Sequence, residues 1–156
     1  MDLTPWQPQS AGEEVVEMSR EEFEALLGRA ELLLSGGLFA QAALGYAALG
    51  VVAPTDPRVF AGMGQACHQQ RLFGPALLAY DIAVELNPGD LAVQALRAEC
   101  GILALDPPAG QQMLAAVLGM GTPDSRSRPY LLRLQRVAAR HSVDGKAAGQ
   151  PGTSHG

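Results

Sequence analysis

The sequence has few aromatic residues, few cysteines and no long apolar run. Phe, Trp and Tyr make up 5% of its 156 residues, so a hydrophobic core has to be built mainly from Leu, Ala and Val. Two cysteines, Cys67 and Cys100, are too few for a disulfide framework. No apolar run reaches the roughly 18 to 20 residues that span a bilayer. These absences exclude a disulfide-stapled scaffold and a bundle of membrane-spanning helices.

The sequence also lacks an excess of positive charge and the pattern of a secretory signal. The net charge of −5 argues against general affinity for nucleic acid phosphates. The first residues, MDLTPWQPQSAGEE, lack the basic and apolar regions of a secretory signal. We therefore expect a soluble cytoplasmic protein that binds neither nucleic acid nor membrane.

What the sequence does contain favours helices. Hydrophobic residues make up 47% of the chain, Ala and Leu are abundant, and β-branched residues are sparse, which predicts an all-α fold. Charge is unevenly distributed: residues 1–31 hold eight acids against two bases, and residues 125–156 hold six bases against one acid. The two ends are therefore electrostatically complementary, within one molecule or between two.

An internal repeat organises the centre of the chain. Four pairs of identical residues lie 34 positions apart: Phe39 and Phe73, Ala42 and Ala76, Tyr46 and Tyr80, and Pro54 and Pro88. This period is typical of the tetratricopeptide repeat, a helix–turn–helix unit. In such a unit Ala76, Tyr80 and Ala83 form the inner stripe of a second helix that docks on the first.

The repeat predicts three helical hairpins, stacked as a short right-handed superhelix and followed by a C-terminal capping helix. The helices are expected over residues 20–35, 39–52, 57–70, 73–86, 91–104, 109–118 and 128–141. Asp56 and Asp90 are suited to cap two of them, whereas Asp106-Pro107-Pro108 is expected to interrupt the degenerate third unit. We expect a flexible arm over residues 1–18, a repeat domain over 19–141 and a disordered tail over 142–156.

One segment carries a more specific resemblance. It comprises Asp56-Pro57-Arg58, the Phe60 to Gly64 stretch, Ala66-Cys67 and Gln69, together with Ala98-Glu99-Cys100 in the third unit. These residues resemble the class II chaperones of bacterial type III secretion, over about residues 20–120. Those proteins are small cytoplasmic chaperones of translocator proteins. The resemblance implies a concave groove that holds an extended segment of a hydrophobic translocator, and a homodimer formed through the N-terminal region. Some members also bind transcriptional regulators.

The first helix of each repeat lines the concave face, which predicts the client-peptide groove. Its expected residues are Leu27, Glu31, Leu34, Arg58, Ala61, Gln65, His68, Ala95, Glu99 and Ile102. The family often has aromatic residues at the positions of Leu27, Glu31 and Leu34, so this groove is less aromatic. The Lys and Asn pattern with which heat-shock cochaperones clamp a terminal carboxylate is missing, so we do not expect that ligand.

Several residues have a structural and a functional interpretation. Gly62-Met63-Gly64 lies inside an expected helix, which disfavours a phosphate loop. Cys67 and Cys100 are expected to be buried thiols without a metal. His68 faces either a ligand or solvent. The stripe of Arg133, Arg136 and Arg140 is interpreted as a solvated face, with docking of a partner as the alternative.

We expect no enzyme activity and no cofactor, because the chain has no nucleophile elbow and the expected role is peptide binding. The favoured hypothesis is a chaperone that keeps translocator proteins soluble before export. One alternative is a needle-subunit cochaperone, whose groove takes a helical tail and which pairs with a second small protein. The other is a general repeat scaffold within a larger assembly.

Overall fold

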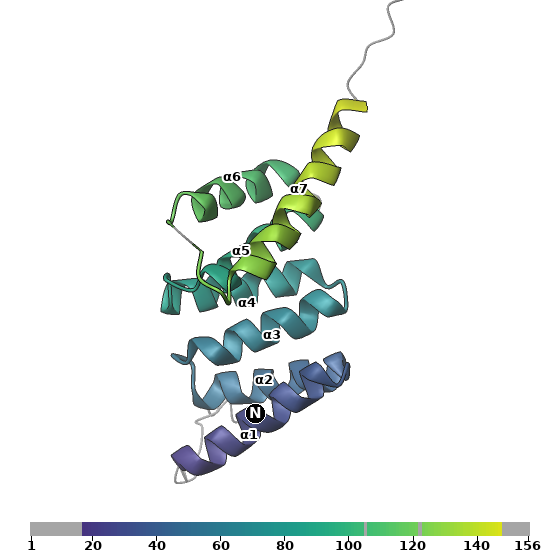
Figure 1. Cartoon of the computed structure of the whole chain (residues 1–156). Coiled ribbons are helices and arrows are strands. Elements are labelled where there is room, and N and C mark those ends of the chain that lie inside the picture. The colour runs from purple at the N-terminus through teal and green to yellow at the C-terminus, as the bar shows by residue number, and fades with distance from the viewer. Residues whose placement is uncertain (1–16, 105, 122, 148–156) are drawn as a thin grey trace, which may run out of the picture.

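The fold is described from a computed structural model, which covers residues 17–104, 106–121 and 123–147. Its elements are α1 (Arg20–Ser35), α2 (Phe39–Val52), α3 (Pro57–Gln69), α4 (Phe73–Leu86), α5 (Leu91–Leu103), α6 (Pro107–Leu118) and α7 (Arg128–Ala147). These residues contain no strand, so the predicted all-α class is confirmed. The first six helices form three antiparallel hairpins that stack in chain order, and α7 crosses the front of the stack (Figure 1).

The helix starts follow from local capping. At the start of α1, the hydroxyl of Ser19 accepts a hydrogen bond from the amide of Glu22 at 3.2 Å, while the Glu22 carboxylate accepts one from the Ser19 amide at 2.8 Å. Asp56 accepts a hydrogen bond from the Arg58 amide at 2.9 Å, and Asp90 caps α5 in the same way. The predicted caps are therefore present.

The third unit departs from its predicted start. Asp106 accepts a hydrogen bond from the amide of Ala109 and caps α6, which begins at Pro107. Pro107 and Pro108 occupy the first helical positions, where no intrahelical hydrogen bond from their nitrogen is needed. The expectation that this segment interrupts the hairpin is wrong because the prolines come directly after a cap.

Glycine and tyrosine pairs set the spacing between the hairpins. A Cβ atom on Gly62 would lie 2.2 Å from the ring of Tyr46, and one on Gly64 would lie 2.5 Å from the ring of Tyr80. The two rings are 1% and 0% exposed, so α3 is held between one tyrosine from α2 and one from α4. The predicted repeat register is thereby confirmed, since equivalent residues fill equivalent gaps.

The third hairpin is tighter still. A Cβ atom on Gly110 would lie 2.3 Å from the backbone nitrogen of Ile102, so α5 and α6 approach each other backbone to backbone. This close approach replaces the tyrosine of the first two hairpins, where the third has Leu114.

The last helix covers the third hairpin from the side of α5. Leu131, Leu134 and Ala138 pack into the same buried cluster as Ala95 and Ile102 of α5, and α7 contacts α5 much more extensively than α6. It also continues to Ala147, so residues 142–147 of the predicted disordered tail are helical. Residues 1–16 of the predicted arm and 148–156 of that tail lie outside the described residues.

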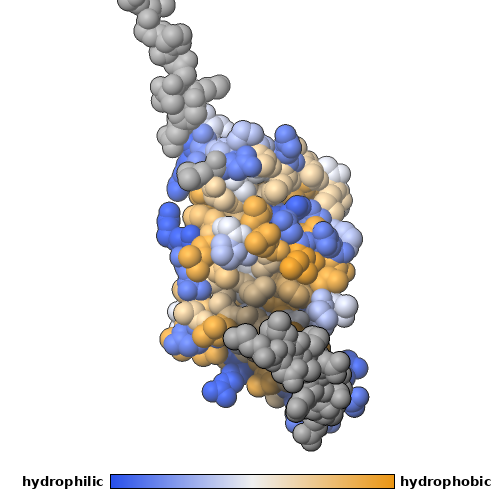
Figure 2. Space-filling model, turned by 180° about the vertical axis from the view of Figure 1, so that it is seen from behind, coloured by the Kyte–Doolittle hydropathy of each residue, from blue (hydrophilic) through white to orange (hydrophobic). Residues whose placement is uncertain are grey.

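The two sides of the stack differ in character. The side opposite α7 shows hydrophobic patches interleaved with hydrophilic ones (Figure 2). The second helices of the first two hairpins, α2 and α4, leave large apolar side chains exposed, among them Leu44 at 73% and Leu78 at 68%. No helix in the described part of the chain combines the length and apolar character needed to cross a bilayer.

Candidate functional site: a groove across the repeats

A cavity of about 390 Å³ lies across the first helices of the repeats. It is lined by Glu31, Leu34, Tyr46, Pro57, Arg58, Ala61, Gly62, Gln65, Ala83, Asn87, Asp90, Val93 and Arg126. These residues come from α1, α2 and α3, from the junction of α4 with α5, and from the segment that leads into α7. The cavity therefore spans all three hairpins on the face where the repeat predicts a groove.

A second cavity of about 380 Å³ adjoins the first. The two share Glu31, Leu34 and Gln65, and the second also includes Phe39 and Gln69. Together they form one surface depression, which we call the groove, running from the junction of α4 and α5 to the start of α2. An elongated ligand can lie along this path, with Glu31 and Gln65 where the two cavities meet.

The groove combines small apolar surfaces with neutral polar groups. Leu34, Ala61 and Val93 supply apolar contacts, while Gln65 and Asn87 supply amides that donate and accept hydrogen bonds. Such a mixture suits an extended peptide, because apolar side chains need burial and the peptide backbone needs hydrogen-bonding partners.

Tyr46 adds a hydroxyl to this lining. Burial raises the pKa of Tyr46 to about 12, with a smaller contribution from the carboxylate of Glu31. The phenol therefore keeps its proton at neutral pH, and its side chain, 1% exposed, forms part of the floor of the groove.

Most charges in the groove are already balanced. Arg58 donates to both oxygens of Glu24, at 2.8 and 3.1 Å, and to both oxygens of Asp56, at 2.7 to 3.3 Å. Arg126 lies 3.7 Å from the carboxylate of Asp90. Among the ion pairs of the described residues, none includes Glu31. The groove thus holds one acid whose charge no described base neutralises.

The structure divides the predicted groove residues into two sets of equal size. Those that line the groove are Glu31, Leu34, Arg58, Ala61 and Gln65. Those that are buried are Leu27, His68, Ala95, Glu99 and Ile102, with exposures of 2%, 6%, 1%, 3% and 1%. None of the buried set lines either cavity: Leu27 packs in the cluster of the first hairpin, and Ala95 and Ile102 pack against α7. The groove residues missed by the prediction come from other elements, among them Tyr46 from α2 and Asn87 and Arg126 from the connections.

The covered part of α5 holds a buried ionic cluster. Glu99 accepts a hydrogen bond at one carboxylate oxygen from Nε of Arg133 at 3.0 Å, and Nη2 of the same guanidinium lies 2.9 Å from that oxygen. His68 places its Nε2 atom 3.8 Å from the same oxygen. Its Nδ1 atom lies 3.3 Å from the hydroxyl of Tyr80. The cluster links α3, α5 and α7 through one carboxylate.

Burial sets the protonation of this cluster. Burial and the guanidinium of Arg133 lower the pKa of His68 to about 4, so its imidazole is neutral at physiological pH. Burial raises the pKa of Glu99, and Arg133 opposes that rise. His68 is therefore neither a ligand contact nor a solvated histidine, and both interpretations of it are wrong.

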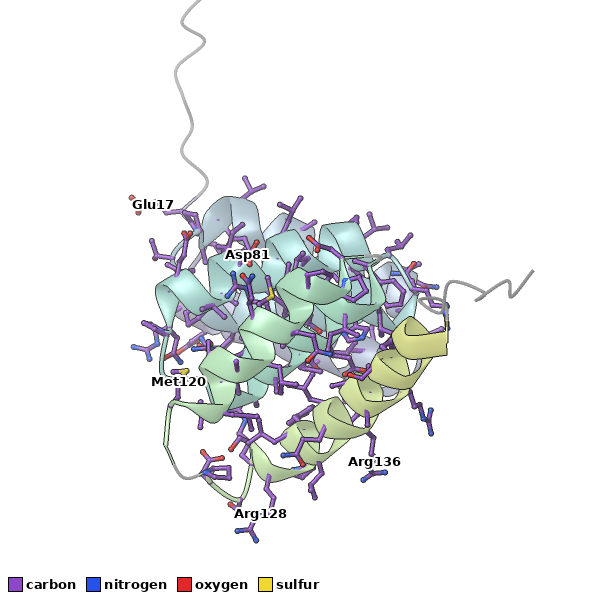
Figure 3. The ribbon with its side chains drawn as sticks, turned by 90° about the horizontal axis from the view of Figure 1, so that it is seen from above. Glu17, Asp81, Met120, Arg128 and Arg136 are labelled. Carbon is purple, nitrogen blue, oxygen red and sulfur yellow. The ribbon has the colours of Figure 1, made fainter. Side chains whose placement is uncertain are left out.

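Two arginines of the stripe on α7, Arg133 and Arg136, have different surroundings. Arg133 is half-exposed yet bound to Glu99, so it is not simply part of a solvated face. Arg136 points away from the helices, as does Arg128 at the start of α7 (Figure 3). The interpretation as a solvated face therefore fits Arg136 and not Arg133.

The repeat spacing itself could have revealed the cluster. Arg58 lies 34 positions after its partner Glu24, and Arg133 lies 34 positions after its partner Glu99. The same step also connects Glu31, Gln65 and Glu99. Equivalent positions of successive first helices are neighbours on the inner face, so opposite charges at this step indicate an ion pair between helices.

The two cysteines are buried, as predicted. Burial raises the pKa of the Cys67 thiol and raises that of Cys100 to about 12, so both thiols are poor nucleophiles. The described residues contain no group of three or more His, Cys, Asp or Glu side chains arranged to hold a metal ion.

The repeats, the groove and the covering helix together define a tetratricopeptide-repeat-like protein. No protein-family model matches the chain, and no curated protein sequence does so either. Solved structures do match. The translocator chaperone SycD of Yersinia enterocolitica aligns over 83% of this chain and 98% of its own, with 17% identity and a TM-score of 0.73, both as a dimer and with a peptide of the translocator YopD.

Two further neighbours have the same architecture. PcrH, in complex with the chaperone-binding region of PopD, aligns over 82% of this chain and 96% of its own, with 16% identity and a TM-score of 0.73. The first repeat domain of human RPAP3 covers 78% of this chain and 95% of its own, with 15% identity and a TM-score of 0.63. At these identities the likeness shows a common fold.

Proposed function

We propose that this chain is a cytoplasmic chaperone of bacterial type III secretion, which binds translocator proteins in its groove and keeps them soluble before export. The observation that carries the proposal is the groove across the first helices of three repeats. It occurs in a fold whose neighbours SycD and PcrH are seen with a YopD peptide and with the chaperone-binding region of PopD. The resemblance around Asp56-Pro57-Arg58 supports the same assignment.

The groove suits the task chemically. In an extended peptide, successive side chains point to opposite sides, so alternate ones pack on Leu34, Ala61 and Val93. Gln65 and Asn87 supply hydrogen bonds to the peptide backbone between these contacts. Binding withdraws an aggregation-prone segment from free solution, by an amount set by the affinity and the chaperone concentration. The task requires no catalysis.

We also propose that the chain forms a homodimer. Both helices of the first hairpin expose large apolar side chains, including Leu32 of α1 at 73% and Val51 of α2 at 82%. A surface of this kind is typical of a protein contact, since burying it removes apolar area from water. Light scattering after size exclusion should give twice the chain mass of 16.3 kDa, whereas the single mass would contradict a dimer.

The direct test of the function is capture of the client. The tagged chain would be recovered from its own bacterium with secretion blocked, and bound proteins would be identified by mass spectrometry. The groove variant Gln65→Trp should lose the client, and the control Gln41→Trp, on the exposed surface of α2, should keep it.

The identity of the captured protein decides between the hypotheses. One or two long proteins with apolar, membrane-inserting segments support the translocator chaperone. A small helical needle-like protein with a second short partner supports the cochaperone instead. A large cytoplasmic assembly without either points to a general scaffold.

A further inference from the structure

Glu31 lines the groove and has no basic partner among the described residues. Glu99, at the equivalent position of the third repeat, does have one. Glu31 of α1 and Glu99 of α5 occupy the same position of the repeat, two steps of 34 residues apart. Glu99 is bound by the guanidinium of Arg133, which comes from a separate segment lying across the repeats. Glu31 lines the groove, and no segment of the described residues supplies a base to it.

The charges around Glu31 sharpen this contrast. The other acid of the groove, Asp90, lies 3.7 Å from Arg126. The nearest groove base along the repeat, Arg58, already contacts two carboxylates. A second anion next to Arg58 would compete with both, whereas a cation next to Glu31 would meet an unneutralised charge. The groove therefore favours a positive charge on its ligand at this point.

The surroundings of Glu31 fit a long basic side chain. Leu34 and Phe39 line the same cavity as Glu31 and provide apolar surface along which a methylene stem can pack. Gln65 and Gln69 supply amide oxygens that accept further hydrogen bonds from a cationic head. An arginine uses this arrangement best, because its planar guanidinium donates two hydrogen bonds to one carboxylate group.

We propose that the client segment carries an arginine, or less favourably a lysine, whose cationic head binds Glu31 where the two cavities of the groove meet. This inference rests on the proposed function, because it assumes that a peptide occupies the groove. In this proposal, Glu31 selects client segments that carry a basic residue. It would bind that residue as Glu99 binds Arg133 within the molecule.

The test selects peptides from a random library displayed on phage, using the full chain, its Glu31→Gln and Glu31→Lys variants and two further variants. Glu85→Gln removes an exposed acid of α4 outside the groove and serves as the matched control, and Gln65→Trp fills the groove. Circular dichroism confirms the fold of each variant. The wild-type selection should contain one dominant basic position, which Glu31→Lys should convert to an acidic one.

The best selected peptide is then compared with an analogue in which citrulline replaces the arginine, because citrulline keeps the shape and loses the charge. Wild type and Glu85→Gln should bind the arginine peptide about fivefold to tenfold more tightly than the analogue. In Glu31→Gln the two peptides should bind alike. Equal binding of both peptides to wild type, or an unchanged preference in Glu31→Gln, would overturn the assignment of Glu31.

The variant Gln65→Trp separates the two proposals. If it abolishes binding but the basic preference is absent, only the role of Glu31 is wrong. If the selected peptides bind Gln65→Trp as well as wild type, or if wild type selects no peptide, the groove is not a peptide site and the proposed function fails with it.

Discussion

At the residue scale, the fold depends on a few contacts that tolerate little change. Tyr46 and Tyr80 are packed so tightly against α3 that two glycines of this helix have no room for a side chain. Glu99 is 3% exposed and its charge is balanced by an arginine from another helix. Substitutions at these contacts should change stability, and control variants distinguish the lost or crowded contact from effects of helix propensity or surface charge.

Gly64→Ala should lower the free energy of unfolding although alanine is the better helix former. The new Cβ atom would lie 2.5 Å from the ring of Tyr80, and such overpacking costs about 1 to 3 kcal/mol. Gly28→Ala in α1 is the control, because nothing lies within 4 Å of its Cβ position and the substitution should stabilise by up to about 1 kcal/mol. Urea denaturation measures both, and a stabilised Gly64→Ala would contradict the packing.

Arg133→Gln should destabilise the chain by about 2 kcal/mol at neutral pH. It leaves the carboxylate of Glu99 buried without its cation, and the loss is moderated because Arg133 is half-exposed. Arg136→Gln removes a solvent-exposed arginine from the same helix and should change stability by less than about 0.5 kcal/mol. Equal effects in the two variants would show that the Glu99 contact contributes nothing.

Stability should also depend on pH through His68. The unfolded chain binds a proton on this histidine below about pH 6.5, whereas the folded chain resists it until its lowered pKa of about 4. The contribution is therefore complete above pH 6.5 and is lost as the pH falls toward 4. Glu99, whose pKa burial raises, acts in the opposite sense, because the folded chain retains a proton that the unfolded chain releases.

A comparison with His68→Gln isolates the histidine. Between about pH 7 and pH 5, wild type should lose about 1 to 2 kcal/mol more stability than the variant. The measurement is the free energy of unfolding in urea at each pH. Parallel pH profiles for the two proteins would contradict the lowered pKa.

At the element scale, α7 is the helix whose position matters most for the site. It covers α5 through Leu131, Leu134 and Ala138 and fixes the segment containing Arg126 at one end of the groove. The groove is consequently open along α1 and α3 and ends at the start of α5, because α7 covers the rest of the inner face of α5. The position of α7 therefore limits the length of the groove.

Leu134→Ala should loosen α7 and cost about 3 kcal/mol, because Leu134 is 0% exposed and its removal leaves a cavity against α5. Leu132→Ala is the same substitution two residues earlier, at a side chain that is 48% exposed, and should cost less than about 0.5 kcal/mol. Limited proteolysis should cut within α7 faster in the first variant. Equal stabilities and cleavage rates would show that α7 is not anchored on α5.

Much of the element order could be predicted from the sequence because its signals are local. The caps Ser19, Asp56 and Asp90 and the stop at Asn87-Pro88 give five of the seven helices to within one residue. Asp106 was missed as a cap because two prolines follow it, a pattern that indicates a break as readily as a first turn. The far end of α7 was missed because Ser, Asp and Gly beyond His141 are weak helix formers.

The groove could be predicted only in part. The 34-residue step indicates which side chains of the first helices face inward, and Glu31, Leu34 and Gln65, which it selects, line both cavities. It does not show which inward side chains another helix covers, so Ala95 and Glu99 were predicted at a surface that α7 occupies. Contributions from connections, such as Asn87 and Arg126, have no periodicity and were not predictable from the repeat.

At the scale of the whole molecule, the acids of residues 17–31 lie at the α1 end of the stack and the bases of residues 126–140 lie on α7 and just before it, toward the other end (Figure 1). Among the described residues, no ion pair joins an acid of residues 17–31 to a base of residues 126–147. The molecule therefore presents an open groove whose lining is mixed in polarity and whose one unneutralised charge is negative. This is the surface expected of a protein that holds a peptide.

We propose above that a client segment lies in the groove between α1, α3 and the start of α5. A photo-crosslinking residue placed at Gln65, where the two cavities meet, tests it most directly when compared with the same residue at Gln41 on the outer surface of α2. With the captured client bound, irradiation should crosslink the client to this chain from Gln65 and not from Gln41. Crosslinks only from Gln41, or equally from both positions, would contradict the proposed groove.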